Sequence, residues 1–183
     1  MTRHSLIRRQ SSALLLIAPQ ERLMPAIESG PAALAAMLRL VDLAERLEVP
    51  VLASEHCADK IGPLVPELRG RLPESAILPK RHFALTAEPS AQPVLAALPE
   101  QVVVAGVEAH VCLLQAALGL IGFGHEVFVV ADAIGSRRDS DRLAAVKRLA
   151  DAGAILATSE MVLFEWVGHA DQPAFKDLLK AIK

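Results

Sequence analysis

Short, uninterrupted apolar runs alternate along this chain with longer amphipathic stretches, and this alternation limits the possible folds more than any other feature. The runs at residues 13–18 and 126–131 have the length of strands and almost no polar residues, as strands buried on both faces of a parallel sheet do. Parallel strands need crossover connections, and the intervening stretches have the length of helices. The pattern predicts an α/β three-layer sandwich, with a six-stranded, mainly parallel sheet and helices on both faces.

The expected elements follow from these runs and from Pro and Gly positions. Strands are expected at residues 13–18, 50–54, 76–79, 101–106, 126–131 and 154–157. Helices are expected at residues 31–47, 90–98, 111–121 and 138–151, with closing helical segments at 161–166 and 173–182. A long loop covers residues 55–75. Because no linker or repeat divides the chain, we expect one domain over residues 1–183, with residues 1–11 as an N-terminal extension.

Composition excludes several classes of protein. Hydrophobic residues make up 52% of the 183 residues and charged residues 22%, which excludes a disordered chain. A net charge of −2 and an aromatic content of 3% argue against a nucleic-acid partner. The apolar run at residues 13–18 is far shorter than the roughly 20 residues that span a bilayer. Only two cysteines are present, which favours a reducing compartment. We therefore expect a cytoplasmic protein with a small-molecule partner and no membrane.

Ligands of parallel α/β sheets bind beyond the carboxyl ends of the strands, so the residues that follow each expected strand are candidate site residues. Cys112 lies at the expected first turn of a helix, where unpaired backbone N–H groups lower the pKa of a thiol and can hold an oxyanion. Lys80 would favour the thiolate if its ammonium reaches Cys112. The alternative is that Cys112 is a small apolar residue that packs the helix on the sheet. The residues expected to contact substrate are Gln20, Leu23, His56 and Phe83.

Other arrangements of reactive residues are less favoured. His110 stands two residues before Cys112, and such positions do not face each other on a helix. Only residues 55–57 cluster as potential metal ligands, and adjacent residues rarely converge on one ion, so we expect neither a metal nor a cofactor. Cys57 also follows a strand, so a redox pair with Cys112 stays open, because a disulfide depends on a Cα separation that sequence does not show.

Several motifs, in this order, resemble the isochorismatase-like cysteine hydrolases, the nicotinamidase-related superfamily. The strongest is Val-Val-Ala-Gly-Val-Glu-Ala-His-Val-Cys at residues 103–112. Its residue pattern most resembles that of the isochorismatase-domain-containing branch. Residues 15–20, 77–83, 131–137 and 158–160 also match, so the resemblance covers roughly residues 12–182. It implies a Rossmann-like hydrolase fold and a homo-oligomer of two or more subunits.

The resemblance also implies roles for individual residues. Cys112 falls on the nucleophile and Lys80 on the lysine of an Asp–Lys–Cys triad. A non-proline cis peptide is implied between Val107 and Glu108, and the backbone N–H groups of Val111 and Cys112 are implied as the oxyanion hole. The triad aspartate falls on Ala18, whose methyl group accepts no proton.

The replacement at position 18 leaves three interpretations open. The chain is an engineered variant, a natural protein whose chemistry has decayed or shifted, or an enzyme in which Glu21, Glu55 or Glu108 stands in for the acid. We favour loss or severe weakening of ordinary hydrolysis. The sequence predicts an isochorismatase-family hydrolase of a small carbonyl or amide substrate; the alternative is an inactive small-molecule-binding or scaffold protein of the same fold.

Overall fold

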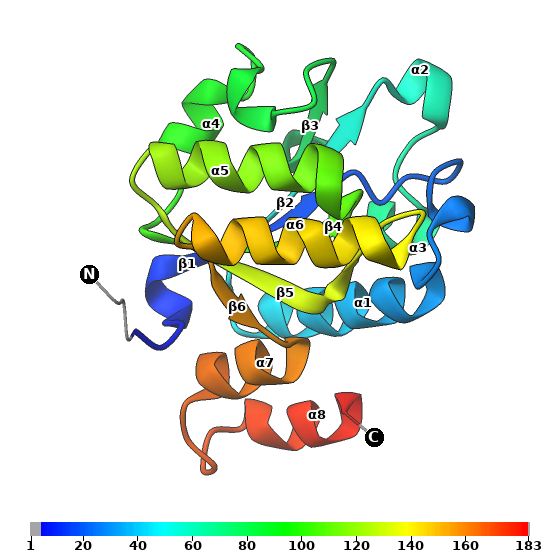
Figure 1. Ribbon diagram of the computed structural model, residues 1–183. Helices are drawn as coiled ribbons and strands as arrows, with labels where there is room; N and C mark the ends of the chain where they lie inside the picture. Colours follow the sequence, from blue (N-terminus) through cyan, green and yellow to red (C-terminus); the bar gives the residue numbers. More distant parts are fainter. Residues whose placement is uncertain (1–4, 183) are drawn as a thin grey trace.

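A computed structural model describes residues 5–182 of the chain. Its six strands form one sheet in the order β3-β2-β1-β4-β5-β6, and every pair of neighbouring strands is parallel (Figure 1). The predicted α/β sandwich is confirmed. The strands are β1 (Ser12–Ile17), β2 (Val51–His56), β3 (Ile77–Lys80), β4 (Gln101–Val107), β5 (Glu126–Gly135) and β6 (Ile155–Ala157).

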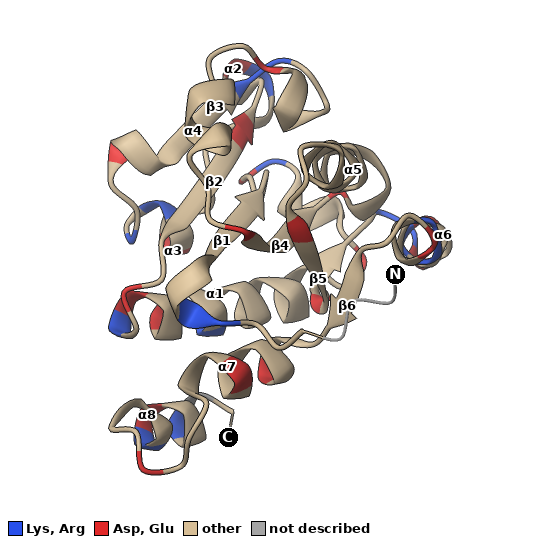
Figure 2. Ribbon diagram, turned by 90° about the vertical axis from the view of Figure 1, so that its left-hand side faces the viewer, with Lys and Arg blue, Asp and Glu red and all other residues tan. Residues whose placement is uncertain are grey.

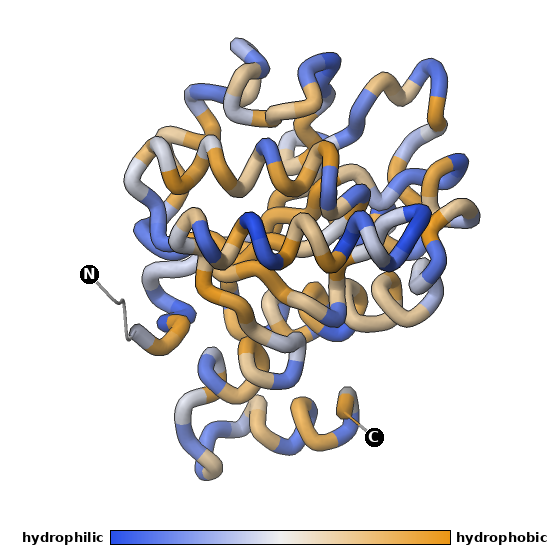
Figure 3. The backbone as a smooth tube through the Cα atoms, viewed as in Figure 1, coloured by the Kyte–Doolittle hydropathy of each residue, from blue (hydrophilic) through white to orange (hydrophobic). Residues whose placement is uncertain are grey.

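Helices cover both faces of the sheet. On one face, α1 (Gly30–Arg46) and α7 (Ser159–Val167) pack on the strands, and α8 (Ala174–Ala181) packs beyond them (Figure 1). On the other face lie α4 (Gln92–Ala96), α5 (Leu114–Gly122) and α6 (Asp139–Asp151). Charged residues gather on the helices and loops (Figure 2), and the strands between the layers are mostly hydrophobic (Figure 3). Two hydrophobic cores result, one on each face.

The central strand β1 has β2 on one side and β4 on the other, so the ends of these three strands lie side by side. Gly106 near the end of β4 has a φ of +124°, and a Cβ there would collide with the backbone of Ile17 in β1. Only glycine permits this approach at this backbone conformation. The close approach brings the turn that follows β4 against the end of β1.

Four local features differ from the predicted elements. The predicted helix at 111–121 is preceded by a π-helical turn, Ala109–Leu113, and α5 begins only at Leu114. Strand β2 continues two residues past its predicted end at 54, and β5 continues four past 131. The predicted loop 55–75 contains two short helices, α2 (Ala58–Ile61) and α3 (Pro66–Arg69). These extensions matter because they move chemistry-bearing residues from loops onto strands.

The predicted N-terminal extension, residues 1–11, is described from residue 5 onward, and residues 1–4 lie outside the described part. Ile7 is buried in the core, and its backbone N–H donates to Glu165 of α7. The described part of the extension is therefore packed on the domain. No helix among residues 5–182 is long and apolar enough to cross a membrane.

Candidate active site

Lys80 and Cys112 meet at the carboxyl edge of the sheet. Lys80 is the last residue of β3, and Cys112 lies in the π-helical turn that follows β4. The Lys80 Nζ atom is 3.3 Å from the Cys112 Sγ atom. Both side chains are on the α4/α5 face, since Leu78, two residues before Lys80, and Cys112 itself belong to that core. The fold therefore joins two reactive groups that are 32 residues apart in the chain.

The ammonium of Lys80 is buried and held by neutral or weakly polar partners. Lys80 is only 3% exposed, and Nζ donates to the backbone carbonyls of His82 and Phe83, each at 3.1 Å, besides contacting Cys112. Among residues 5–182 no carboxylate forms an ion pair with it. Burial lowers the pKa of Lys80, while the neighbouring Cys112 opposes that shift. Burying an ammonium without a carboxylate partner costs free energy of solvation, and this cost favours the neutral amine and so lowers the pKa.

The predicted lowering of the Cys112 pKa is wrong. Burial raises the pKa of the Cys112 thiol, and the attraction of Lys80 offsets this only in part; the charge of Glu108 raises it further. Cys112 is 5% exposed and lies among apolar side chains, so the thiolate loses most of its hydration. In the resting site the thiol form is favoured, and a proton acceptor is needed before the sulfur can act as a nucleophile.

Ala18 lies directly beyond β1 and belongs to the same hydrophobic core as Cys112. It is fully buried, has a φ of +48°, and its backbone N–H donates to the Ser54 carbonyl at 3.1 Å. A left-handed conformation is uncommon for alanine and better tolerated by Asp, Asn or Gly. The backbone at this position therefore suits a residue type that the chain does not have there.

Ser54 and His56 supply polar atoms that lack partners. Both belong to β2 and alternate with Glu55, so they face the α4/α5 side together with Lys80. Ser54 is fully buried and its hydroxyl has no hydrogen-bond partner. The Nδ1 atom of His56 is likewise buried and unpartnered. Sequence analysis missed Ser54, because the strand was expected to end there and a strand serine carries no distinctive signal.

The predicted substrate-contacting residues do not all gather at this site. Gln20 is fully buried, and its side chain accepts from the His56 N–H at 2.7 Å and donates to the His56 carbonyl at 3.1 Å, so it ties β1 to the end of β2. The His56 ring contacts that of Phe83, with 5.1 Å between centroids, and Phe83 is 53% exposed. Leu23 packs against the core on the α1 face, whereas Cys112 belongs to the core on the α4/α5 face.

The turn that carries Cys112 begins with a cis peptide bond between Val107 and Glu108. Within the turn the Val111 N–H donates to the Glu108 carbonyl at 3.1 Å. An oxyanion at this place would therefore compete with that carbonyl for one of its two predicted donors. The Glu108 carboxylate accepts from the Arg137 guanidinium at 2.8 Å. His110, which adjoins the nucleophile turn, pairs with the Ser136 hydroxyl at 3.0 Å and not with Cys112.

The three acids considered as substitutes have other environments. Glu21 is exposed beyond β1. Glu55 points to the face opposite Ser54, where it accepts from the Leu64 N–H at 2.8 Å and from Arg69 at 2.6 Å. Glu108 is occupied by Arg137. None of these carboxylates is hydrogen-bonded to Lys80 or Cys112.

Glu88 orders the loop after β3, a role that sequence analysis did not anticipate. Its carboxylate accepts from the Arg81 N–H at 2.9 Å and lies 3.1 Å from the His82 ring. These hydrogen bonds lower the pKa of Glu88 to about 2. The loop they order contains the two carbonyls that hold Lys80. Burial, followed by the charges of Lys80 and Arg81, lowers the pKa of His56, so its imidazole is neutral near pH 7.

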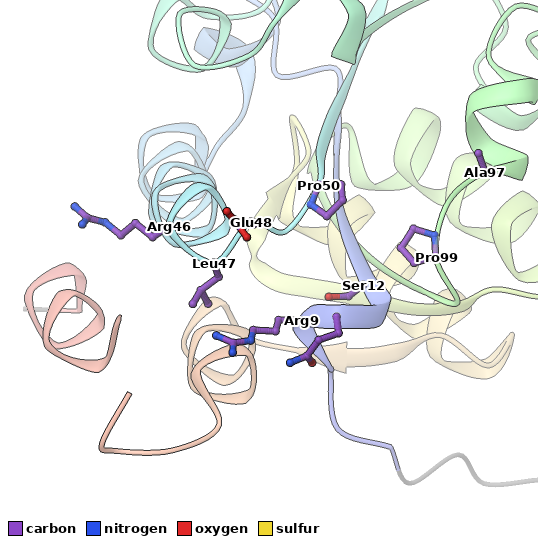
Figure 4. A pocket seen from close by; sticks show the side chains of 9 residues that line it. Arg9, Ser12, Arg46, Leu47, Glu48, Pro50, Ala97 and Pro99 are labelled. Carbon is purple, nitrogen blue, oxygen red and sulfur yellow. The ribbon is translucent and has the colours of Figure 1, made fainter. Parts of the chain in front are cut away.

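An open cavity lies at each of the two edges of the sheet where strands begin or end. The larger, of about 610 Å³, lies at the amino edge of the sheet among Arg9, Arg46 and Pro99 (Figure 4), and Cys112 is not among the residues that line it. A second, of about 450 Å³, is lined by Cys57 and Lys80 among others, beside β3. In the part of the chain that the structure describes, no three His, Cys, Asp or Glu side chains are grouped to hold a metal ion.

Known proteins share this fold and much of this sequence. The mouse isochorismatase domain-containing protein 2A is 36% identical over 176 residues, covering 95% of this chain and 84% of the relative. The Caenorhabditis elegans MAR1 ribonuclease structure has a TM-score of 0.90 at 36% identity, covering 97% of this chain and 92% of that one. YcaC from Pseudomonas aeruginosa, solved with covalent acrylamide, has a TM-score of 0.90 at 27% identity, covering 98% and 92%. YcaC from Escherichia coli, described as an octameric hydrolase of unknown specificity, has a TM-score of 0.87 at 26% identity, covering 100% and 98%. The model of the isochorismatase domain matches residues 12–161, and the chain belongs to the isochorismatase family.

Proposed function

We propose that this chain is a cysteine hydrolase of small carbonyl or amide compounds in which Cys112 is the nucleophile and Lys80 its charge partner. The observation that carries the proposal is the 3.3 Å contact between Lys80 Nζ and Cys112 Sγ at the carboxyl edge of the sheet. In the reaction the Cys112 sulfur attacks the carbonyl carbon while its proton is transferred to the nitrogen of the leaving amine, and backbone N–H groups hold the oxyanion. Water then hydrolyses the thioester, which releases the acid and restores the thiol.

The proposed hydrolase lacks a proton-accepting side chain at position 18. The family resemblance puts the proton-accepting aspartate there, and Ala18 provides no acceptor. General acid–base catalysis contributes roughly 10²–10⁴-fold, so ordinary hydrolysis by this chain is expected to be slower by about that factor. The raised pKa of Cys112 agrees with this expectation, because Glu21, Glu55 and Glu108 form no hydrogen bond to the thiol that would let them take its proton.

Labelling with acrylamide tests the nucleophile, and the covalent acrylamide recorded for the Pseudomonas YcaC structure makes it a suitable probe. In a Cys57→Ser protein, Cys112 is the only thiol, because the chain has two cysteines. Intact mass spectrometry is expected to show one adduct, and a Cys112→Ser protein measures the reactivity of Cys57. If Cys57 reacts and Cys112 stays unmodified over the same time, Cys112 is not an accessible nucleophile and the proposal fails.

A second candidate function is binding without turnover, and the observation that favours it is Ala18. The fold and pocket would then hold a small carbonyl compound that the site cannot hydrolyse. An Ala18→Asp variant separates the two functions, since turnover after restoring the acid requires an otherwise complete hydrolase.

Partner and assembly proposals follow from the relatives. We propose a homo-oligomer, supported by the octamer named for Escherichia coli YcaC, and light scattering that shows a monomer would contradict it. The Caenorhabditis structure is described as a ribonuclease, so RNA is included in the substrate panel to test this chain for ribonuclease activity. The net charge of −2 and the low aromatic content favour a small molecule over RNA as substrate.

A further inference from the structure

The Lys80 ammonium is a buried positive group with no carboxylate in ion-pair contact among residues 5–182, and the charge of Glu88 acts on it only from beyond that distance. The ammonium is 3% exposed, and its three contacts are two carbonyls and the Cys112 sulfur. Glu55 and Glu108 are occupied by Arg69 and Arg137. A buried charge is retained at low cost only when it is paired. The arrangement is therefore electrostatically incomplete as it stands.

Two orphaned polar atoms lie on the neighbouring strand β2, on the same face of the sheet as Lys80. The Ser54 hydroxyl is fully buried without a partner, on the strand whose carbonyl receives the Ala18 N–H. The buried Nδ1 atom of His56, next along the same face of β2, also has no partner. Buried polar groups in native proteins are normally hydrogen-bonded, so an unsatisfied pair next to an unpaired ammonium indicates a missing ligand.

We propose that this site binds a small carboxylate over the Ala18 methyl group, where it pairs with Lys80, accepts a hydrogen bond from Ser54, and takes the proton from Cys112. The inference rests on the proposed function and specifies it: the carboxylate supplies the acid–base group that the chain lacks. A hydroxyl and an ammonium are donors, which suits an acceptor with two oxygens. A single ammonium balances one negative charge, so a monocarboxylate fits better than a doubly charged phosphate.

The chemistry balances with acrylamide as electrophile. The carboxylate accepts the Cys112 Sγ proton, and the sulfur electron pair forms the bond to the β-carbon of acrylamide. The α-carbon of the resulting enolate then takes up a proton, which the carboxylic acid returns, and the carboxylate is regenerated. The carboxylate is thus a catalyst of thioether formation and is not consumed.

Acceleration of Cys112 labelling by formate tests the proposal. In the Cys57→Ser protein, formate is expected to raise the rate of acrylamide addition saturably by at least about tenfold, which is less than the roughly 10²–10⁴-fold of a positioned general base because formate is not tethered to the chain. Formamide, which has the same shape and no charge, is expected to have no effect at matched ionic strength, and phosphate is expected to have little. Ser54→Ala is expected to weaken the apparent formate affinity, whereas Ala substitution of exposed Ser140 on α6 is not.

The Ala18→Asp variant provides the decisive comparison, because its own carboxylate then occupies the position. The formate effect is expected to vanish in that variant. An equal effect in Ala18→Asp, an equal effect of formamide, or no effect of formate would each overturn the proposal.

Binding of ¹³C-formate, followed by NMR, separates this inference from the proposed function. Saturable binding that Ser54→Ala weakens, with Cys112 inert to acrylamide, would leave the carboxylate site standing and refute the hydrolase. Labelling of Cys112 with neither formate binding nor acceleration would refute the carboxylate site and leave the hydrolase standing. If the Ala18→Asp variant does not fold, the Ser54→Ala and formamide comparisons still show whether the site binds a carboxylate.

The source of the carboxylate is decided by a matched pair of electrophiles. N-acryloylglycine carries a carboxylate, and N-acryloylglycinamide is its neutral counterpart. Faster labelling by the charged compound indicates that the substrate itself provides the carboxylate. Equal labelling by the two, together with acceleration by free formate, indicates a separate carboxylate ligand.

Discussion

Replacing Lys80 by Met removes the ammonium and keeps an unbranched side chain that is one atom shorter and of similar volume. At 3.3 Å and an effective dielectric constant of about 20, the attraction between the ammonium and a thiolate is worth about 5 kcal/mol before the desolvation of both groups is subtracted. An opposite charge this close typically shifts a pKa by roughly 1–3 units. Loss of Lys80 is therefore expected to raise the Cys112 pKa by that amount and to lower the thiolate fraction about 10- to 1000-fold at neutral pH.

The expected loss of reactivity is smaller than the loss of thiolate. A more basic thiolate is a better nucleophile, which returns roughly half of the effect on a logarithmic scale. Iodoacetamide labelling of Cys112 in a Cys57→Ser background is thus expected to slow by about 3- to 30-fold in Lys80→Met. Lys147→Met, which alters an exposed lysine of α6 paired only with Asp151, is the control and is expected to label at the parent rate.

Thermal unfolding of Lys80→Met checks that the protein remains folded. Because the substitution removes a buried charge without a carboxylate partner, we expect an unchanged or higher melting temperature. An intact Lys80→Met protein whose Cys112 labels at the parent rate would refute the reasoning, since it would show that the ammonium does not influence the sulfur.

Two further predictions concern the frame of the site. NMR titration of the His56 ring is expected to give a midpoint below the ordinary value of about 6.5. As the pH falls, His56 therefore becomes protonated in the unfolded chain before it does in the folded protein. The stability of the fold is expected to decrease as the pH falls from about 6.5 through the folded pKa of His56. A midpoint above 6.5 would contradict the burial argument. Gly106→Ala is expected to lower stability by roughly 3 kcal/mol or more, because its methyl group meets the Ile17 backbone at a strained φ. Denaturant unfolding measures this, and Gly122→Ala, where nothing lies within 4 Å, should change stability by at most about 1 kcal/mol. Similar losses in the two variants would contradict the packing argument.

The meeting of Lys80 with Cys112 could be predicted from sequence because it follows from topology. In a parallel sheet every strand ends at the same edge, so residues that follow strands gather there. The pKa of Cys112 could not be predicted in the same way, because it depends on how deeply the π-helical turn is buried among apolar side chains. A helix start predicts a favourable field, but it contains no information on desolvation.

Side-chain direction was the other quantity that sequence did not reveal. Gln20 follows β1 at the functional edge, yet its amide turns inward to tie down β2. Leu23 stands three residues later and packs on the opposite face of the sheet. Ser54 was placed at a strand end, and the extension of β2 to His56 places it on the same face of the sheet as Lys80. A shift of two residues in a strand boundary thus decided which side chains belong to the site.

Turnover by the Ala18→Asp variant tests the central claim most directly, namely that this is a hydrolase site that lacks only its proton acceptor. A panel of small amides is assayed for released ammonia with the parent chain, Ala18→Asp, and the Ala18→Asp/Cys112→Ser double variant. Hydrolysis of at least one amide is expected to rise about 10²–10⁴-fold in Ala18→Asp and to disappear in the double variant. A folded Ala18→Asp protein that hydrolyses nothing in the panel, or one whose activity survives the loss of Cys112, would contradict the account.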